Sequence, residues 1–123
     1  MNNLLNLTKE FLIESDVDYA GLWQIDSWVE LDLKIKNLKE RKVYILNFIL
    51  EMLKSDYVRV GNLAKGGGFD AWEGTPEELI KQVDKIWDIS HPEEPTGFYV
   101  WFNITEKGKV ELQRLQNIEQ AAR

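Results

Sequence analysis

The chain of 123 residues contains no cysteine, a single histidine and three prolines. Without cysteine it forms no disulfide bond and offers no thiolate ligand, so a cytoplasmic location is the simplest expectation. Zinc sites use several nitrogen or sulfur ligands, which this composition does not supply. No acidic stretch follows the calcium-loop template either. We therefore expect neither a metal nor a cofactor.

Long apolar runs are also missing. The longest, residues 43–53, is interrupted by Asn47 and Glu51, so we expect no membrane-spanning segment. The first residues have no basic start and no small-residue cleavage site, and they resemble a helix more than a signal peptide. With 44% hydrophobic and 11% aromatic residues, the chain is not disordered, and 1–123 is expected to form one domain.

Basic residues are in the minority, with 15 Lys and Arg against 21 Asp and Glu, for a net charge of −6. Nucleic-acid binders normally present a basic face, so nucleic acid is disfavoured as a partner. The charge is also segregated: residues 34–65 carry eight bases and three acids, whereas 66–106 carry nine acids and two bases. This pattern has two interpretations, namely internal pairing with solvated faces, or an acidic surface that binds a basic partner.

Apolar spacing and N-cap residues predict five helices. The fourth is the best defined, because Thr75, Pro76 and Glu78 follow the pattern of a capping box with proline at the first helical position. Residues 29–36 alternate apolar and charged side chains, which weakly favours a strand but is also compatible with a continued second helix. The expected helices are 4–15, 19–28, 38–54 (capped by Asn37), 75–88, and one capped by Thr105 with Val110, Leu112, Leu115 and Ile118 facing inward.

Two further stretches read as strands, 57–63 and 98–105. Between them lie three glycines at 66–68, and then Phe69 and Trp72 in a loop expected to tuck onto the core. Strands separated by a helical excursion predict an α+β fold, in which a small antiparallel sheet packs on helices.

The sequence contains few residues in patterns that are typical of catalytic sites. His91 lies in a loop rich in acids and prolines, where a solvated side chain is the simplest interpretation. The serines lie at helix ends or within a helix, where capping accounts for them. The segment GNLAKGGGFD lacks the Gly-Lys-Ser/Thr ending of a phosphate loop. An acid pair of the glycosidase kind can always be drawn among 21 carboxylates, so it carries little weight. We therefore expect a protein that is not an enzyme.

The order of elements, three helices followed by strand, excursion and strand, ends in FNITEKGKVEL (102–112). Over residues 38–112 this resembles a winged-helix domain, which implies a winged-helix-like fold and, as one possibility, a DNA-binding transcriptional regulator. The bases that would contact phosphates in that case are Lys34, Lys36, Lys39, Arg41 and Lys42. The chain departs from the pattern because the wing would contain the helix 75–88 and is not basic.

Three stretches, MLKSDYVRVGNL, GGFDAWEGTPEELIKQVDKIWDI and PTGFYVWFNITEKG, span most of 52–108. They are similar to small acidic bacterial proteins that look like immunity proteins of polymorphic or contact-dependent toxin systems. This resemblance implies a non-enzymatic partner of a cognate toxin domain, which in many such systems is a basic nuclease.

Our leading hypothesis is therefore an acidic protein that neutralises a toxin, and the alternative is the winged-helix DNA-binding regulator. An inhibitor of this kind needs shape and charge but no catalytic residue. Tyr99 and Trp101 share one face of the expected strand, and that face would be a platform for a partner if it is open. The predicted partner-binding residues are Asp70, Trp72, Glu73, Glu77, Glu78, Asp84, Asp88, Glu93, Glu94 and Tyr99.

Overall fold

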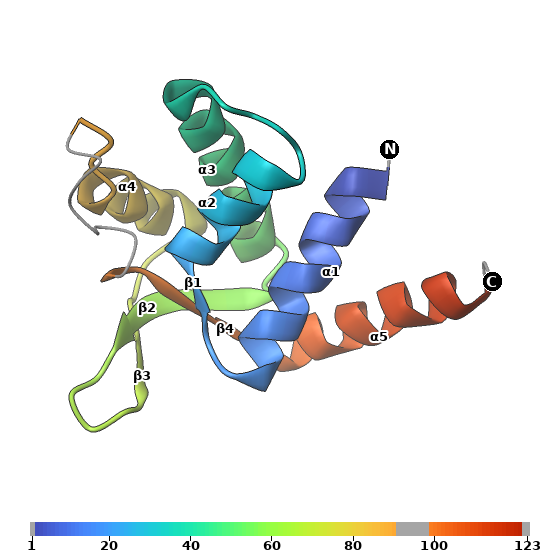
Figure 1. The fold of residues 1–123 in the computed structure, drawn as a ribbon. Helices are drawn as coiled ribbons and strands as arrows, with labels where there is room; N and C mark the ends of the chain where they lie inside the picture. The colour runs from blue at the N-terminus through green and yellow to red at the C-terminus, as the bar shows by residue number, and fades with distance from the viewer. Residues whose placement is uncertain (1, 91–98, 122–123) are drawn as a thin grey trace.

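The computed structural model describes residues 2–90 and 99–121 of the chain, and Figure 1 shows their arrangement. The helices are α1 (Asn2–Val17), α2 (Leu22–Leu31), α3 (Leu38–Lys54), α4 (Pro76–Ile86) and α5 (Glu106–Ala121). The strands are β1 (Ala20–Gly21), β2 (Val58–Leu63), β3 (Phe69–Ala71) and β4 (Trp101–Ile104). This confirms the predicted α+β fold with a small antiparallel sheet. None of the described helices has both the length and the apolar character needed to cross a membrane.

The sheet has the order β1-β4-β2-β3, and all its neighbours are antiparallel. Strand β4 is central because Phe102 pairs with Ala20 on one side and with Val60 on the other. The sequence of elements is helix, strand, two helices, strand, excursion and strand, with the first strand next to the last. This order is similar to the one that the winged-helix resemblance implied, with β3 and α4 in the place of the wing.

Helices α1 to α4 lie on one side of the sheet, and α5 extends away from its end (Figure 1). The side chains of Val60, Phe102 and Ile104 are buried toward those helices. Phe11 of α1 has no exposed surface and meets the rings of Phe48 and Phe102 edge to face, at centroid distances of 5.5 and 5.2 Å. Aromatic pairs in this geometry add to the stabilisation that burial already gives, so Phe11 ties α1 to both α3 and the sheet.

The three predicted caps are confirmed, because each depends on residues within one helical turn. Asn37 and Thr75 accept hydrogen bonds from the backbone N–H groups of Glu40 and Glu78, at 3.0 and 3.2 Å. Thr105 accepts from the N–H of Gly108 at 3.0 Å, so its hydroxyl caps the start of α5. Each bond satisfies a donor that would otherwise lack a partner at the helix end.

The start of the second helix differs from the prediction. Asp18 precedes the predicted helix 19–28 and is a residue type that could cap it, but it does not. The chain first forms β1, and α2 begins after Gly21, whose backbone N–H donates to the side-chain oxygen of Gln24 at 2.8 Å. The weakly favoured strand at 29–36 is also absent. Val29 to Leu31 complete α2, and the remainder is an irregular connection to α3. Its alternation arises because Leu33 and Ile35 pack half-buried against the core while their neighbours face solvent.

Four side chains differ in burial from what the helical spacing of the sequence suggests. Val110 and Ile118 on α5 are 72% and 48% exposed, because α5 extends beyond the body and only Leu112 and Leu115 on its inner face reach the core. Val43 on α3 is likewise 60% exposed. Conversely, Arg41 was expected in an exposed first turn and is buried, because carboxylates of α2 lie beside it. In addition, Phe69 belongs to strand β3 and not to a loop.

Candidate functional site

The segment from Phe69 to Asp88 carries most of the excess negative charge. It contains six acids and two bases, which gives −4 out of the total of −6. All six carboxylates are exposed: Asp70, Glu73, Glu77, Glu78, Asp84 and Asp88. The segment is held in place by α4, whose Leu79 and Val83 are buried, as is Trp87 just after it. We call this segment the acidic flank.

Helix α4 packs along α3 in the antiparallel sense, and two ion pairs fix it there. Lys42 lies 2.9 Å from Asp84, and its Nζ also donates to the carbonyl oxygen of Trp87 at 2.6 Å. At the other end, Lys54 lies 3.9 Å from Glu77, which is a long and exposed contact of small energetic value. Asp84 and Glu77 therefore contact lysines of α3 and also remain exposed to solvent.

Other members of the acidic flank have local roles. Glu78 accepts a hydrogen bond from the backbone N–H of Thr75 at 2.9 Å, and this bond lowers the pKa of its carboxyl group, with a further contribution from the Thr75 hydroxyl. Asp88 accepts from the backbone N–H of Ser90 at 2.9 Å. None of the hydrogen bonds and ion pairs found among the described residues engages the side chain of Asp70 or Glu73. Of the acids in this segment, these two therefore contribute least to holding it in place.

The predicted acids do not form one cluster. Glu73, Glu77 and Glu78 lie around the start of α4, and Asp84 and Asp88 lie at its end, about 10 Å further along the helix axis. Exposed lysines interrupt the row between them, at Lys81 and Lys85. Asp70 is on the edge strand β3. Glu93 and Glu94 lie outside the described residues.

The two predicted aromatic anchors have different environments. Trp72 is half-buried, and its Nε1 donates to the side-chain oxygen of Asn62 at 2.9 Å, so it serves mainly to hold the segment after β3 against β2. Tyr99 is 61% exposed. Although a strand was predicted from residue 98, β4 begins only at Trp101, and Tyr99 lies just before it, next to the buried Val100.

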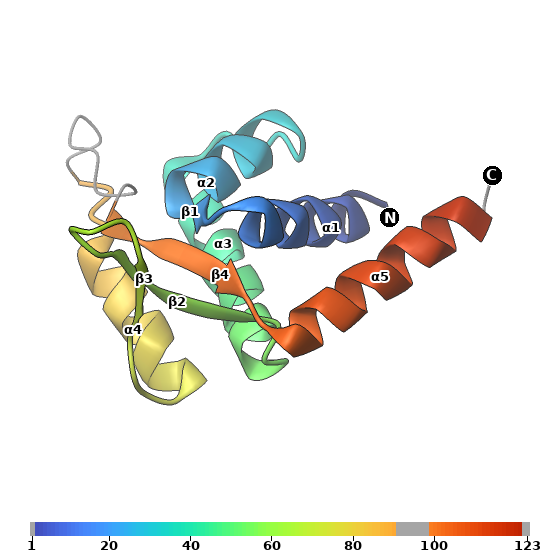
Figure 2. The ribbon, with the colours of Figure 1, turned by 90° about the horizontal axis from the view of Figure 1, so that it is seen from below.

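One side of the sheet faces away from α1 to α4, and Figure 2 views the molecule from it. Sequence reasoning recognised Tyr99 and Trp101 here but not the residues that join them from other segments. We call this surface the open face. It is formed by Tyr19, Trp23, Arg59, Leu63, Phe69, Trp101 and Asn103, with Tyr99 at its edge just before β4.

Close packing fixes several of these side chains. A Cβ atom on Gly21 would lie 2.5 Å from Nε1 of Trp23 and 3.2 Å from the ring of Trp101, so both indoles rest against this glycine. Tyr19 stacks on Phe69, with ring centroids 5.4 Å apart and planes inclined by 21°. The guanidinium of Arg59 lies 5.5 Å from the centre of the Phe69 ring. It also donates to the side-chain oxygen of Asn103 at 2.9 Å.

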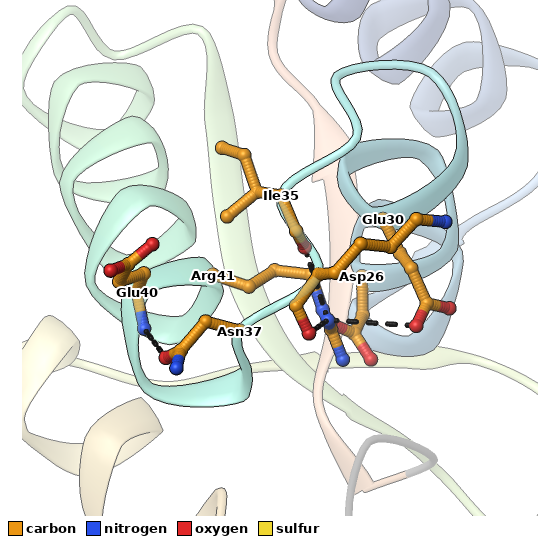
Figure 3. Close-up of polar contacts among 7 residues, drawn as sticks. Asp26, Glu30, Ile35, Asn37, Glu40 and Arg41 are labelled. Atoms are coloured by element: carbon orange, nitrogen blue, oxygen red, sulfur yellow. Dashed lines mark hydrogen bonds and ion pairs between the residues drawn. The ribbon is translucent and has the colours of Figure 1, made fainter.

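A third surface is the basic connection before α3, which the alternative hypothesis uses. Two of its five bases are engaged inside the fold. Lys42 binds α4 as described above. Arg41 donates to Asp26 at 2.5 Å and to the carbonyl oxygens of Ile35 and Lys36 at 3.1 and 3.2 Å, with Glu30 3.6 Å away (Figure 3). The remaining three, Lys34, Lys36 and Lys39, are exposed.

Two hollows are found among the described residues, and the larger, of about 570 Å³, is an open polar depression beside Arg59, Asn103 and Lys109. A pocket of about 140 Å³ between α1 and α2 brings Glu10 and Asp32 together beside Trp28. Ligand pockets are typically about 300–1,000 Å³, so this one suits only a few water molecules. Among residues 2–90 and 99–121, no group of three or more acidic or histidine side chains is placed to hold a metal ion.

Comparison of the chain with protein-family models, with curated proteins and with solved structures finds no match. The structure itself shows an α+β domain with an acidic flank, an open aromatic face and a short basic connection.

Proposed function

We propose that this protein is a non-enzymatic binding protein that neutralises a bacterial toxin as its immunity protein, and that the toxin domain is a basic nuclease. The observation that supports this most is the acidic flank, which gathers −4 of the net charge of −6 into 20 residues on a packed helix and strand. A fixed row of carboxylates attracts a basic surface over several ångströms and steers its approach.

The wing-like excursion supports the same proposal. In this chain it consists of β3 and α4, whose exposed side chains include four carboxylates and two lysines, and this net negative charge repels nucleic acid. A basic nuclease has a positive cleft that must attract phosphates, so an acidic helix of this kind complements it. Such a partner would be bound tightly, and its association would slow as salt screens the charges, with a Debye length of about 8 Å at physiological ionic strength.

Reversal of two charges on the acidic flank tests the proposal. We expect Asp70→Lys combined with Glu73→Lys to slow association with the toxin domain encoded beside this chain by about tenfold at low salt. The matched control is Glu10→Lys with Glu51→Lys, which makes the same change in net charge on exposed positions of α1 and α3. Stopped-flow mixing with the purified toxin domain measures both rates.

Two results would count against the proposal in different ways. Equal slowing by both double variants would mean that net charge acts and that the acidic flank is not the interface. If the wild-type protein forms no 1:1 complex with that toxin domain and gives no protection against it, the assignment as its immunity protein is wrong.

The winged-helix order of elements favours a second candidate, a DNA-binding regulator. Here Lys34, Lys36 and Lys39 would contact phosphates at the start of α3. A gel-shift experiment at low salt tests this candidate. If the protein binds DNA, the wild type should retard a duplex, and the variant with all three lysines changed to glutamine should not. A duplex that runs free with the wild-type protein removes the candidate.

A further inference from the structure

The open face concentrates apolar surface in an otherwise charged molecule. Trp23, Leu63 and Tyr99 are 41%, 39% and 61% exposed and belong to the eight large apolar residues that the described chain leaves exposed. The half-buried rings of Tyr19, Phe69 and Trp101 lie between them. Contiguous apolar patches on soluble proteins commonly mark interaction sites, and aromatic side chains are enriched at the centres of such sites.

These rings are already ordered before any partner arrives. The indoles of Trp23 and Trp101 rest against Gly21, and Tyr19 is stacked on Phe69. The strands beneath them are tied by the ladder between β1, β4 and β2. Binding to such a surface loses little side-chain entropy, which is one of the main costs of association.

The charges on the open face identify the occupant. Arg59 is the only charged residue among the eight that form it, and none of the ion pairs found in the described chain includes Arg59. A polar depression beside Arg59 and Asn103 is bordered by the carboxylates of Asp16, Asp56 and Glu106 and by Lys109. Lys109 pairs with Glu106 at 3.3 Å, so Asp16 and Asp56 are the border acids left to meet a further cation. One molecule therefore presents a cation on an aromatic platform with carboxylates at its border.

We propose that the open face docks a second copy of this chain in a twofold-symmetric dimer. In a twofold interface the same patch meets itself, so Arg59 of each copy approaches the border carboxylates of the other, and the contact is made twice. A basic partner would instead bring its charges close to Arg59 and Lys109, where like charges repel. The acidic flank shares Phe69 of β3 with the open face, but none of its carboxylates belongs to the open face, so this dimer does not use the charges proposed to bind the toxin.

Sedimentation velocity of the full chain, over a hundredfold range of protein concentration at physiological salt, tests the proposal. We expect a reversible monomer–dimer equilibrium, and tryptophan emission that shifts to shorter wavelength as Trp23 and Trp101 lose water. Tyr99→Glu and Arg59→Glu should each raise the dimer dissociation constant by at least about tenfold, as loss of an interface anchor commonly does. Circular dichroism confirms that each variant remains folded.

The matched control is Val110→Glu, which places the same acid at an apolar position that is 72% exposed on α5. We expect it to leave the dimer unchanged. A protein that remains monomeric over the whole concentration range overturns the proposal, because the open face then does not bind a second copy of the chain. A dimer that survives both open-face variants, or that only Val110→Glu dissociates, overturns it as well.

Discussion

Gly108→Ala is expected to lower the free energy of unfolding by about 1–3 kcal/mol, although alanine is the better helix former. Helix propensity alone would favour alanine by about 1 kcal/mol. However, a Cβ atom at this position of α5 would lie 2.1 Å from the carbonyl oxygen of Tyr57 and 2.8 Å from Ile104. That carbonyl accepts a hydrogen bond from Thr105 at 3.0 Å, so it cannot move aside without loosening the junction of β2, β4 and α5.

Urea unfolding followed by circular dichroism measures this effect. Gly66→Ala is the control, because a Cβ atom there would meet nothing within 4 Å. We expect that variant to change the stability by less than about 1 kcal/mol. A Gly108→Ala protein more stable than the wild type would show that α5 does not approach Tyr57 as closely as the structure has it.

Arg41→Met is expected to lower the free energy of unfolding by about 2–3 kcal/mol. Arg41 joins α3 to α2 through Asp26 and holds the connection between them through two carbonyl oxygens (Figure 3). Methionine fills much of the same volume but leaves these acceptors without their charged donor. The effect stays below that of a fully buried pair because the side chain of Asp26 is 32% exposed and water can reach it.

Local opening gives a second measurement for this variant. Without Arg41 the connection should detach from the core, and trypsin should then cut faster after Lys34 and Lys36. Lys39→Met removes an exposed base two residues away and serves as the control, for which we expect a change within about 0.5 kcal/mol. Equal cutting of both variants at these two lysines would contradict the anchoring role of Arg41.

Local signals in the sequence were sufficient for the helix caps. Asn37, Thr75 and Thr105 act through neighbours three residues away, so their spacing is visible without any tertiary information. Strand β1 could not be found in this way. It has two residues, and it exists because Ala20 and Gly21 pair with residues some 80 positions later.

The candidate surfaces were predictable to different degrees. That the acids from Asp70 to Asp88 face solvent follows from the apolar face of α4, which turns Leu79 and Val83 inward. The ion pairs of Glu77 and Asp84 with Lys54 and Lys42 depend on the packing of α4 against α3, which the sequence does not display. The predicted strand that paired Tyr99 with Trp101 on one face begins only at Trp101, and it is the sheet order and the packing at Gly21 that bring residues of α2, β2 and β3 to the open face.

Because β4 is a central strand and also the last of the described strands, the sheet cannot be completed early in synthesis. A growing polypeptide that has not yet delivered Ile104 has only the β2–β3 hairpin of this sheet. Phe11 then lacks the ring of Phe102 against which it packs. We expect the nascent chain to remain open to chaperones and proteases until β4 emerges, and the core to close around it in one late, cooperative event.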